Sequence, residues 1–148
     1  MERFQALVAR YPVPEGALVP VLAMAQEEFG YLSPEAIAYV SELMGLPRSR
    51  VYGAATFYSM LNLKPVGRHH IQVCRTLPCA LRGAERITEH LKRKLGIGVG
   101  ETTEDGRFTL SEVECLASCG TAPMMQVNET YYESLSEKKI DEILSKMT

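Results

Sequence analysis

Residues 73–87 read VCRTLPCALRGAERI and contain two of the four cysteines of the chain, Cys74 and Cys79. The residues that lead to the first cysteine, HIQVC at 70–74, alternate between polar and apolar side chains, which predicts a short strand ending at Cys74. Residues 80–95 carry apolar side chains at three- and four-residue steps, which predicts an amphipathic helix beginning just after Cys79. Both cysteines therefore lie where a strand passes into a helix.

The other two cysteines, Cys115 and Cys119, form a second close pair within the sequence VECLASCGTAP. Residues 107–114 alternate in the manner of a strand, so Cys115 follows a strand end. Cys119 lies in the loop before a hairpin that is predicted around Asn128 and Glu129. We expect all four cysteines at element ends or in loops and not on core faces. Two strand-end loops on one side of a sheet can bring four thiols together.

The apolar pattern changes character near residue 65. Residues 1–65 have helical periodicity, with Ser33 and Pro34 as the start signal and Gly45 as the stop signal of one helix, which predicts a small helical bundle. Residues 66–148 follow the order β-α-β-β-β-α, with the last strands antiparallel and both helices packed on the sheet. The predicted fold class is therefore α+β.

The composition of the chain argues against nucleic acid as a partner and against a membrane or secreted location. The 148 residues are 46% hydrophobic and 23% charged, enough to bury a core, and the formal net charge is -2 without any basic stripe. The N-terminus lacks a signal-peptide pattern, and no run reaches the roughly 18 apolar residues of a membrane span. We therefore expect a cytoplasmic chain that does not insert into a membrane and does not bind nucleic acid. Structural disulfides are rare in such a reducing compartment.

Four thiols in two close pairs admit several explanations. Isolated cysteines are often buried small hydrophobes, but scattered core cysteines seldom fall into two tight pairs at strand ends. A redox dithiol requires Cys-x-x-Cys, which neither pair has. Zinc accepts four thiolates, usually in pairs two to four residues apart. A [2Fe–2S] cluster takes two thiolates on each iron, and Cys-x4-Cys occurs in plant-type ferredoxins.

The surroundings of the cysteines fit a cluster, and zinc stays the structural alternative. Small and apolar residues next to them would limit the access of water to the sulfurs, and backbone N–H groups in tight loops can donate to them. Cys79 is expected at a helix N-terminus, where the dipole favours a thiolate. Arg75 and Arg82 flank the first pair. They either raise the potential of a cluster and hold a partner, or are two solvated side chains.

These motifs resemble a known family, the small [2Fe–2S] subunit of bacterial NADH:quinone oxidoreductase, which is respiratory complex I. The resemblance covers nearly the whole chain and includes FYSMLNLKPVGRHHIQVCRTLPCALRGAE and GETTEDGRFTLSEVECLASCGTAPMMQVN. Its motif is Cys-x4-Cys followed by Cys-x3-Cys about 35 residues on, with all four positions filled here. The resemblance implies a thioredoxin-like [2Fe–2S] ferredoxin domain at 66–148 and one cluster held by Cys74, Cys79, Cys115 and Cys119.

The same resemblance implies a role in an assembly. The helical part, residues 1–65, would dock on a flavoprotein subunit that binds FMN and NADH, and the cluster would exchange single electrons with that flavin. The chain itself has no G-x-G-x-x-G after a strand and no Walker motif, so we expect FMN and NADH on the partner only. The chain would act as a subunit of an enzyme at the inner membrane surface, without catalysis of its own. Related subunits serve NAD-linked hydrogenases and formate dehydrogenases, and a zinc-stabilised interaction module is the third alternative.

Overall fold

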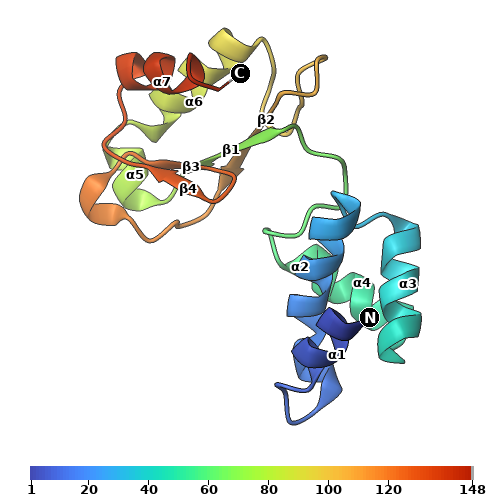
Figure 1. Cartoon of the computed structure of the whole chain (residues 1–148). Coiled ribbons are helices and arrows are strands. Elements are labelled where there is room, and N and C mark those ends of the chain that lie inside the picture. The colour runs from blue at the N-terminus through green and yellow to red at the C-terminus, as the bar shows by residue number, and fades with distance from the viewer. Residues whose placement is uncertain (148) are drawn as a thin grey trace. The chain divides into compact units, whose positions relative to one another are not determined.

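A computed structural model describes residues 1–147, and its chain divides into two compact units, Met1–Pro65 and Val66–Thr148 (Figure 1). Each unit has its own hydrophobic core of buried side chains. The first unit is entirely helical and the second combines helices with a sheet, so the predicted α+β class is confirmed. Within residues 1–147, none of the helices combines the length and the apolar character needed to cross a membrane.

The first unit packs three main helices around one apolar core. Leu22, Val40 and Val51 come from three different helices and are all at most 1% exposed. Ser33 accepts a hydrogen bond from the Ala36 N–H at 3.1 Å, so the predicted N-cap is confirmed. The elements are α1 (Glu2–Val8), the 3-10 turn η1 (Pro14–Ala17), α2 (Leu18–Phe29), α3 (Pro34–Met44) and α4 (Arg48–Phe57).

The second unit is a four-stranded mixed sheet with helices on it. Its strand order is β2-β1-β3-β4, with β1 and β2 parallel and the other neighbours antiparallel. The order of strands and of the final helix matches the predicted β-α-β-β-β-α series, but two helices stand where one was predicted between the first two strands. The elements are β1 (His69–Cys74), α5 (Leu77–Leu81), α6 (Ala84–Leu95), β2 (Phe108–Val113), the 3-10 turn η2 (Cys119–Thr121), β3 (Met125–Val127), β4 (Thr130–Tyr132) and α7 (Glu137–Leu144).

One face of this sheet carries the core of the second unit. Ile71 pairs with Leu110 on β2 and with Val127 on β3, so these apolar side chains share one face. Leu91 of α6 and Ile140 of α7 belong to the same buried cluster, and both helices lie together on one side of the sheet (Figure 1). This packing of α6 and α7 on one face fixes the position of β1 and β2, whose C-terminal ends lead into the two cysteine loops.

The single helix predicted over residues 80–95 is wrong, because the structure contains two helices. A short helix α5 ends at Leu81, and α6 begins at Ala84 after a break at Gly83. Gly83 has φ +93°, a left-handed conformation that glycine adopts readily and that interrupts a right-handed helix. The break separates α5, which carries Cys79, from the longer helix that packs on the sheet.

A buried histidine links the two long helices of the second unit. His90 of α6 is only 7% exposed, and its Nε2 lies 2.8 Å from Asp141 Oδ1 on α7. Its Nδ1 lies 3.4 Å from Glu137 Oε2, and Lys94 Nζ lies 3.2 Å from Asp141 Oδ1. The hydrogen bond from His90, followed by the interaction with Lys94, lowers the pKa of Asp141 below its usual range.

The lowered pKa of Asp141 makes the second unit sensitive to acid. A carboxyl group that is more acidic when folded stabilises the fold above its unfolded pKa of about 3.9. This stabilisation is lost as the pH falls through the folded pKa. We expect the urea midpoint of the second unit to fall on acidification below about pH 4, and Asp141→Asn to flatten that dependence. Glu142→Gln, on the same helix and without an ion pair within residues 1–147, is the matched control; equal pH profiles for both variants would contradict the expectation.

Gly67 lies where the chain enters the sheet, and a side chain there would collide with backbone. A Cβ on Gly67 would lie 2.9 Å from Arg107 C and from the N and C atoms of Phe108. We expect Gly67→Ala to destabilise the second unit by about 1–3 kcal/mol, the usual cost of overpacking. Gly53→Ala is the control, since a Cβ inside α4 meets nothing within 4 Å and should stabilise by about 0.5–1 kcal/mol. Urea unfolding monitored by circular dichroism measures both, and a neutral Gly67→Ala would show that β2 yields easily.

Candidate metal centre

The sheet topology brings the two cysteine loops to one edge. Cys74 is the last residue of β1, and Cys115 follows β2 by two residues. β1 and β2 are parallel neighbours, so their C-terminal ends lie at the same edge, and Cys74 is in register with Val113. Cys79 lies in α5, just after β1, and Cys119 opens the turn η2. Local helix and turn formation thus places one further thiol beside each strand end.

The first pair is buried, which corrects the expectation that no cysteine would lie in a core. Cys74 is 2% exposed and Cys79 is 1% exposed. They form a small apolar cluster with Ala84, Ala122 and Met124, separate from the core under the sheet. The Thr76 hydroxyl lies 3.4 Å from the Cys74 sulfur. The neighbouring alanine and methionine side chains keep water away from these two sulfurs.

The second pair is exposed and closely spaced. The sulfur atoms of Cys115 and Cys119 are 3.9 Å apart. The backbone N–H of Ala117 donates to the Cys115 sulfur at 3.3 Å, and Ala117 has φ +61°, a left-handed conformation that costs a non-glycine residue about 1 kcal/mol. The strained backbone at Ala117 therefore points its N–H group at the Cys115 sulfur.

Glu133 supports the second loop, a role that residue type and spacing did not indicate. Its carboxylate accepts hydrogen bonds from the hydroxyl groups of Ser118 and Thr121, the latter at 2.6 Å. Ser118 directly precedes Cys119 and Thr121 follows it by two residues, and their hydrogen bonds lower the pKa of Glu133. Glu133 follows β4 and lies far from Cys119 in sequence, so only the fold brings them together.

An ion pair joins the two loops. Arg75 directly follows Cys74, Glu114 directly precedes Cys115, and Arg75 Nη2 and Nε lie 2.7 and 3.0 Å from Glu114 Oε1. Both side chains are mostly exposed, so the pair contributes little to stability, typically about 0–1 kcal/mol. The Arg75 charge is therefore balanced by Glu114, which weakens the hypothesis that this arginine raises a cluster potential.

The thiols influence one another's protonation. Cys79 lies in the first turn of α5, as expected. Burial, followed by the hydrogen bond with Cys74, raises the pKa of its thiol to about 11. Burial is also the largest influence on Cys74, but hydrogen bonds from Thr76 and the Leu116 backbone outweigh it and lower its pKa. The hydrogen bond with Cys115 raises the pKa of Cys119. A metal that binds these sulfurs must displace protons, as metal binding by thiols generally does.

The four thiols fit a two-iron cluster by number, type and pairing. Among residues 1–147, no group of three or more histidine, cysteine or acidic side chains gathers closely enough to hold one metal ion. The thiols instead stand as two pairs, one within β1 and α5 and one within the loop after β2. A [2Fe–2S] cluster takes four cysteine thiolates, two on each iron, so each pair matches the ligand need of one iron.

The fold and the paired thiols define an iron–sulfur protein of the ferredoxin class, built as a mixed sheet with a helical unit before it. Residues 4–148 match the family described as "Thioredoxin-like [2Fe-2S] ferredoxin". The chain belongs to this family, and the fold and cofactor that its motifs predicted are thereby confirmed.

Similar proteins with curated names share most of their length with this chain. The chain is 46% identical to the E subunit of NADH-quinone oxidoreductase of Rickettsia conorii over 147 residues, which covers 97% of this chain and 87% of the relative. It is 48% identical to the protein of the same name in Rickettsia felis over 142 residues, covering 93% and 84% of the two chains.

Solved structures agree on the fold. The chain superimposes with a TM-score of 0.74 and 24% identity on a chain of the structure titled "Crystal structure of NAD+-reducing [NiFe]-hydrogenase in the air-oxidized state". The match covers 85% of this chain but only 22% of the hydrogenase chain. At this identity the similarity concerns the fold alone.

Proposed function

We propose that this chain is the [2Fe–2S] electron-transfer subunit of an NADH-quinone oxidoreductase, with Cys74, Cys79, Cys115 and Cys119 as the iron ligands. The observation that carries the proposal is the placement of both cysteine pairs at the common edge of β1 and β2. The relatives at 46–48% identity, which carry the name of that subunit over more than nine-tenths of this chain, support the parent complex.

The chemistry assigns a division of labour. NADH gives up two electrons as hydride, which a flavin accepts and then releases singly. A bound [2Fe–2S] cluster supplies the one-electron step. This chain would hold the irons through its two thiol pairs, shield the inner pair with Met124 and Ala122, and donate the Ala117 N–H to a sulfur. The flavin and NADH would belong to a flavoprotein subunit, and the complex would place both chains at the cytoplasmic side of the inner membrane.

The helical unit, residues 1–65, is proposed as the docking element for that flavoprotein. Large apolar side chains remain on its surface, with Phe57 79% exposed and Met60 61% exposed. Phe57 stacks edge-on against Tyr58, which is 37% exposed, with ring centroids 5.0 Å apart. Apolar surface of this kind is typical of a protein contact.

The first test of the proposed function is chemical. The chain is purified without oxygen, its visible spectrum is recorded, and iron, zinc and acid-labile sulfide are assayed before an electron paramagnetic resonance spectrum of the dithionite-reduced protein. A brown protein with about two irons and two sulfides per chain and a spin-half reduced signal is expected. NADH should then reduce the cluster only when the flavoprotein is present. A colourless protein with one zinc ion would overturn the proposal.

A further inference from the structure

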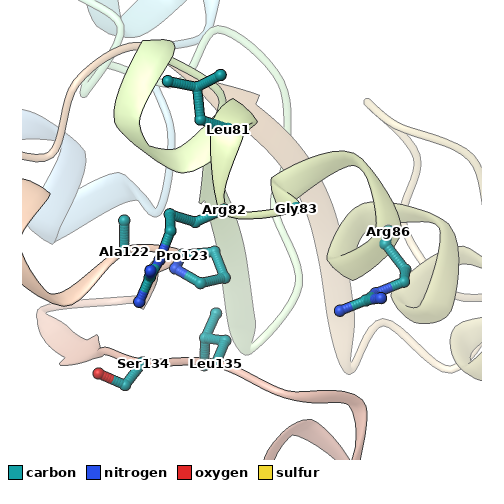
Figure 2. A pocket seen from close by; sticks show the side chains of 8 residues that line it. All are labelled: Leu81, Arg82, Gly83, Arg86, Ala122, Pro123, Ser134 and Leu135. Carbon is teal, nitrogen blue, oxygen red and sulfur yellow. The ribbon is translucent and has the colours of Figure 1, made fainter.

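A hollow with two arginines lies beside the helix that carries Cys79. The hollow has a volume of about 620 Å³, and its lining includes Arg82, Arg86, Pro123, Ser134 and Leu135. In Figure 2 the Arg82 side chain lies beside Ala122 and Pro123, and Arg86 stands on the opposite side of Pro123 and Leu135. No acidic side chain lines the hollow, so its charge is positive.

Neither arginine has a carboxylate partner within residues 1–147, whereas five other arginines of the chain do. Arg82 and Arg86 are exposed and take part in no ion pair among the described residues. Side chains that do pair with carboxylates are Arg3, Arg48, Arg50, Arg75 and Arg107. Two guanidinium groups without a carboxylate partner in the described chain, placed around one hollow, suit an acidic ligand group, because each guanidinium can bind a carboxylate through two N–H groups.

Two exposed leucines lie on the same short helix, and one of them, Leu81, also lines the hollow. Leu77 is 70% exposed and Leu81 is 78% exposed, and they lie four residues apart, on one side of α5. Cys79 lies between them in sequence and is 1% exposed, so α5 turns its leucines to solvent and its cysteine inward. A molecule seated on the leucines would lie within about one helix diameter, ~10 Å, of the Cys79 sulfur.

We propose that one surface of this chain docks its electron-exchange partner. This surface, called the α5 surface, consists of Leu77, Leu81, Arg82 and Arg86. The partner would offer an apolar depression to the two leucines and an aspartate or glutamate to the two arginines. A protein fits this surface better than a small anion does, because an anion would leave both leucines in water. Electron transfer weakens steeply with distance, so a contact directly outside Cys79 suits it. The inference rests on the proposed function and adds the face and chemistry of the contact.

The test compares charge reversals on one helix and its neighbour. The double variant Arg82→Glu with Arg86→Glu is expected to bind the flavoprotein subunit of the same complex about 10- to 100-fold more weakly than the natural chain. Arg93→Glu, an exposed arginine near the other end of α6 that does not line the hollow, should change the dissociation constant less than about 3-fold. Isothermal titration calorimetry gives both constants, and an unchanged visible spectrum shows that the variant cluster is intact.

Two further variants separate the outcomes. Leu81→Ser should weaken the same binding, and changing one acidic residue of the flavoprotein to arginine should restore binding to the double reversal. Natural chain that fails to bind the flavoprotein would contradict the proposed function itself. Natural and reversed chains that bind equally well would overturn the docking surface and leave the function standing. A dimer of the natural chain that the reversal dissociates would assign the surface to a second copy, and would also overturn the proposal.

Discussion

Replacing Cys79 with alanine is expected to leave the purified chain with about one-tenth or less of its iron and acid-labile sulfide. Cys79 is 1% exposed, and no other cysteine is available to replace it, because the chain has four in all. In the proposed site, the iron bound by this pair would retain only the Cys74 thiolate and face an apolar pocket formed by Ala84, Ala122 and Met124, none of which offers a second thiolate. A bound cluster would therefore be lost during purification.

The control for this variant is Ala80→Ser, at the exposed neighbouring position on the same short helix. It should keep about two irons per chain and an unchanged visible spectrum. Circular dichroism checks that the Cys79→Ala chain keeps its helices, so that metal loss is not confused with unfolding. A Cys79→Ala chain that retains a full cluster would remove Cys79 from the ligand set and require a different donor.

Local signals in the sequence were sufficient for most elements. Ser33 precedes α3 and accepts a hydrogen bond from the Ala36 N–H, as its position before an apolar series predicted. Ser136 caps α7 in the same way through the Lys139 N–H at 3.2 Å. Asn128 has φ +52° in the hairpin between β3 and β4, at the turn that the residue types indicated. These features depend on neighbours in sequence, which is why residue type and spacing identify them.

Features that depend on distant contacts could not be predicted in the same way. The break at Gly83 was missed because leucine and isoleucine spacing continues across it, while only the backbone conformation shows the interruption. The burial of Cys74 and Cys79 depends on Met124, which arrives from a later loop. Glu133 is linked to the Cys119 loop only through the folded sheet. Spacing therefore identified the thiols as candidates, whereas packing decides which pair is shielded and what supports the other.

Leu91→Ala is expected to destabilise the second unit by about 2–5 kcal/mol, the usual cost of emptying a fully buried leucine site. Leu91 is 0% exposed and lies in the α6 face that packs on the sheet beside Ile71 and Leu110. Hydrogen exchange of the β1 amides, measured at increasing urea concentrations, reports the unfolding midpoint of this unit. The midpoint should fall by about 1 M or more. Leu81→Ala is the matched control, because its side chain is 78% exposed and should change stability by no more than about 0.5 kcal/mol.

The same substitution also tests whether the two cores are energetically separate. The buried cluster that contains Leu91 draws only on residues after 66, and the cluster around Leu22 draws only on residues before 65. Leu91→Ala should therefore leave the exchange rates of the α2 amides unchanged, and Leu22→Ala should leave those of the β1 amides unchanged. If Leu91→Ala instead lowered protection in α2 and β1 by the same factor, the two units would unfold together, and their separate cores would not be separate folding units.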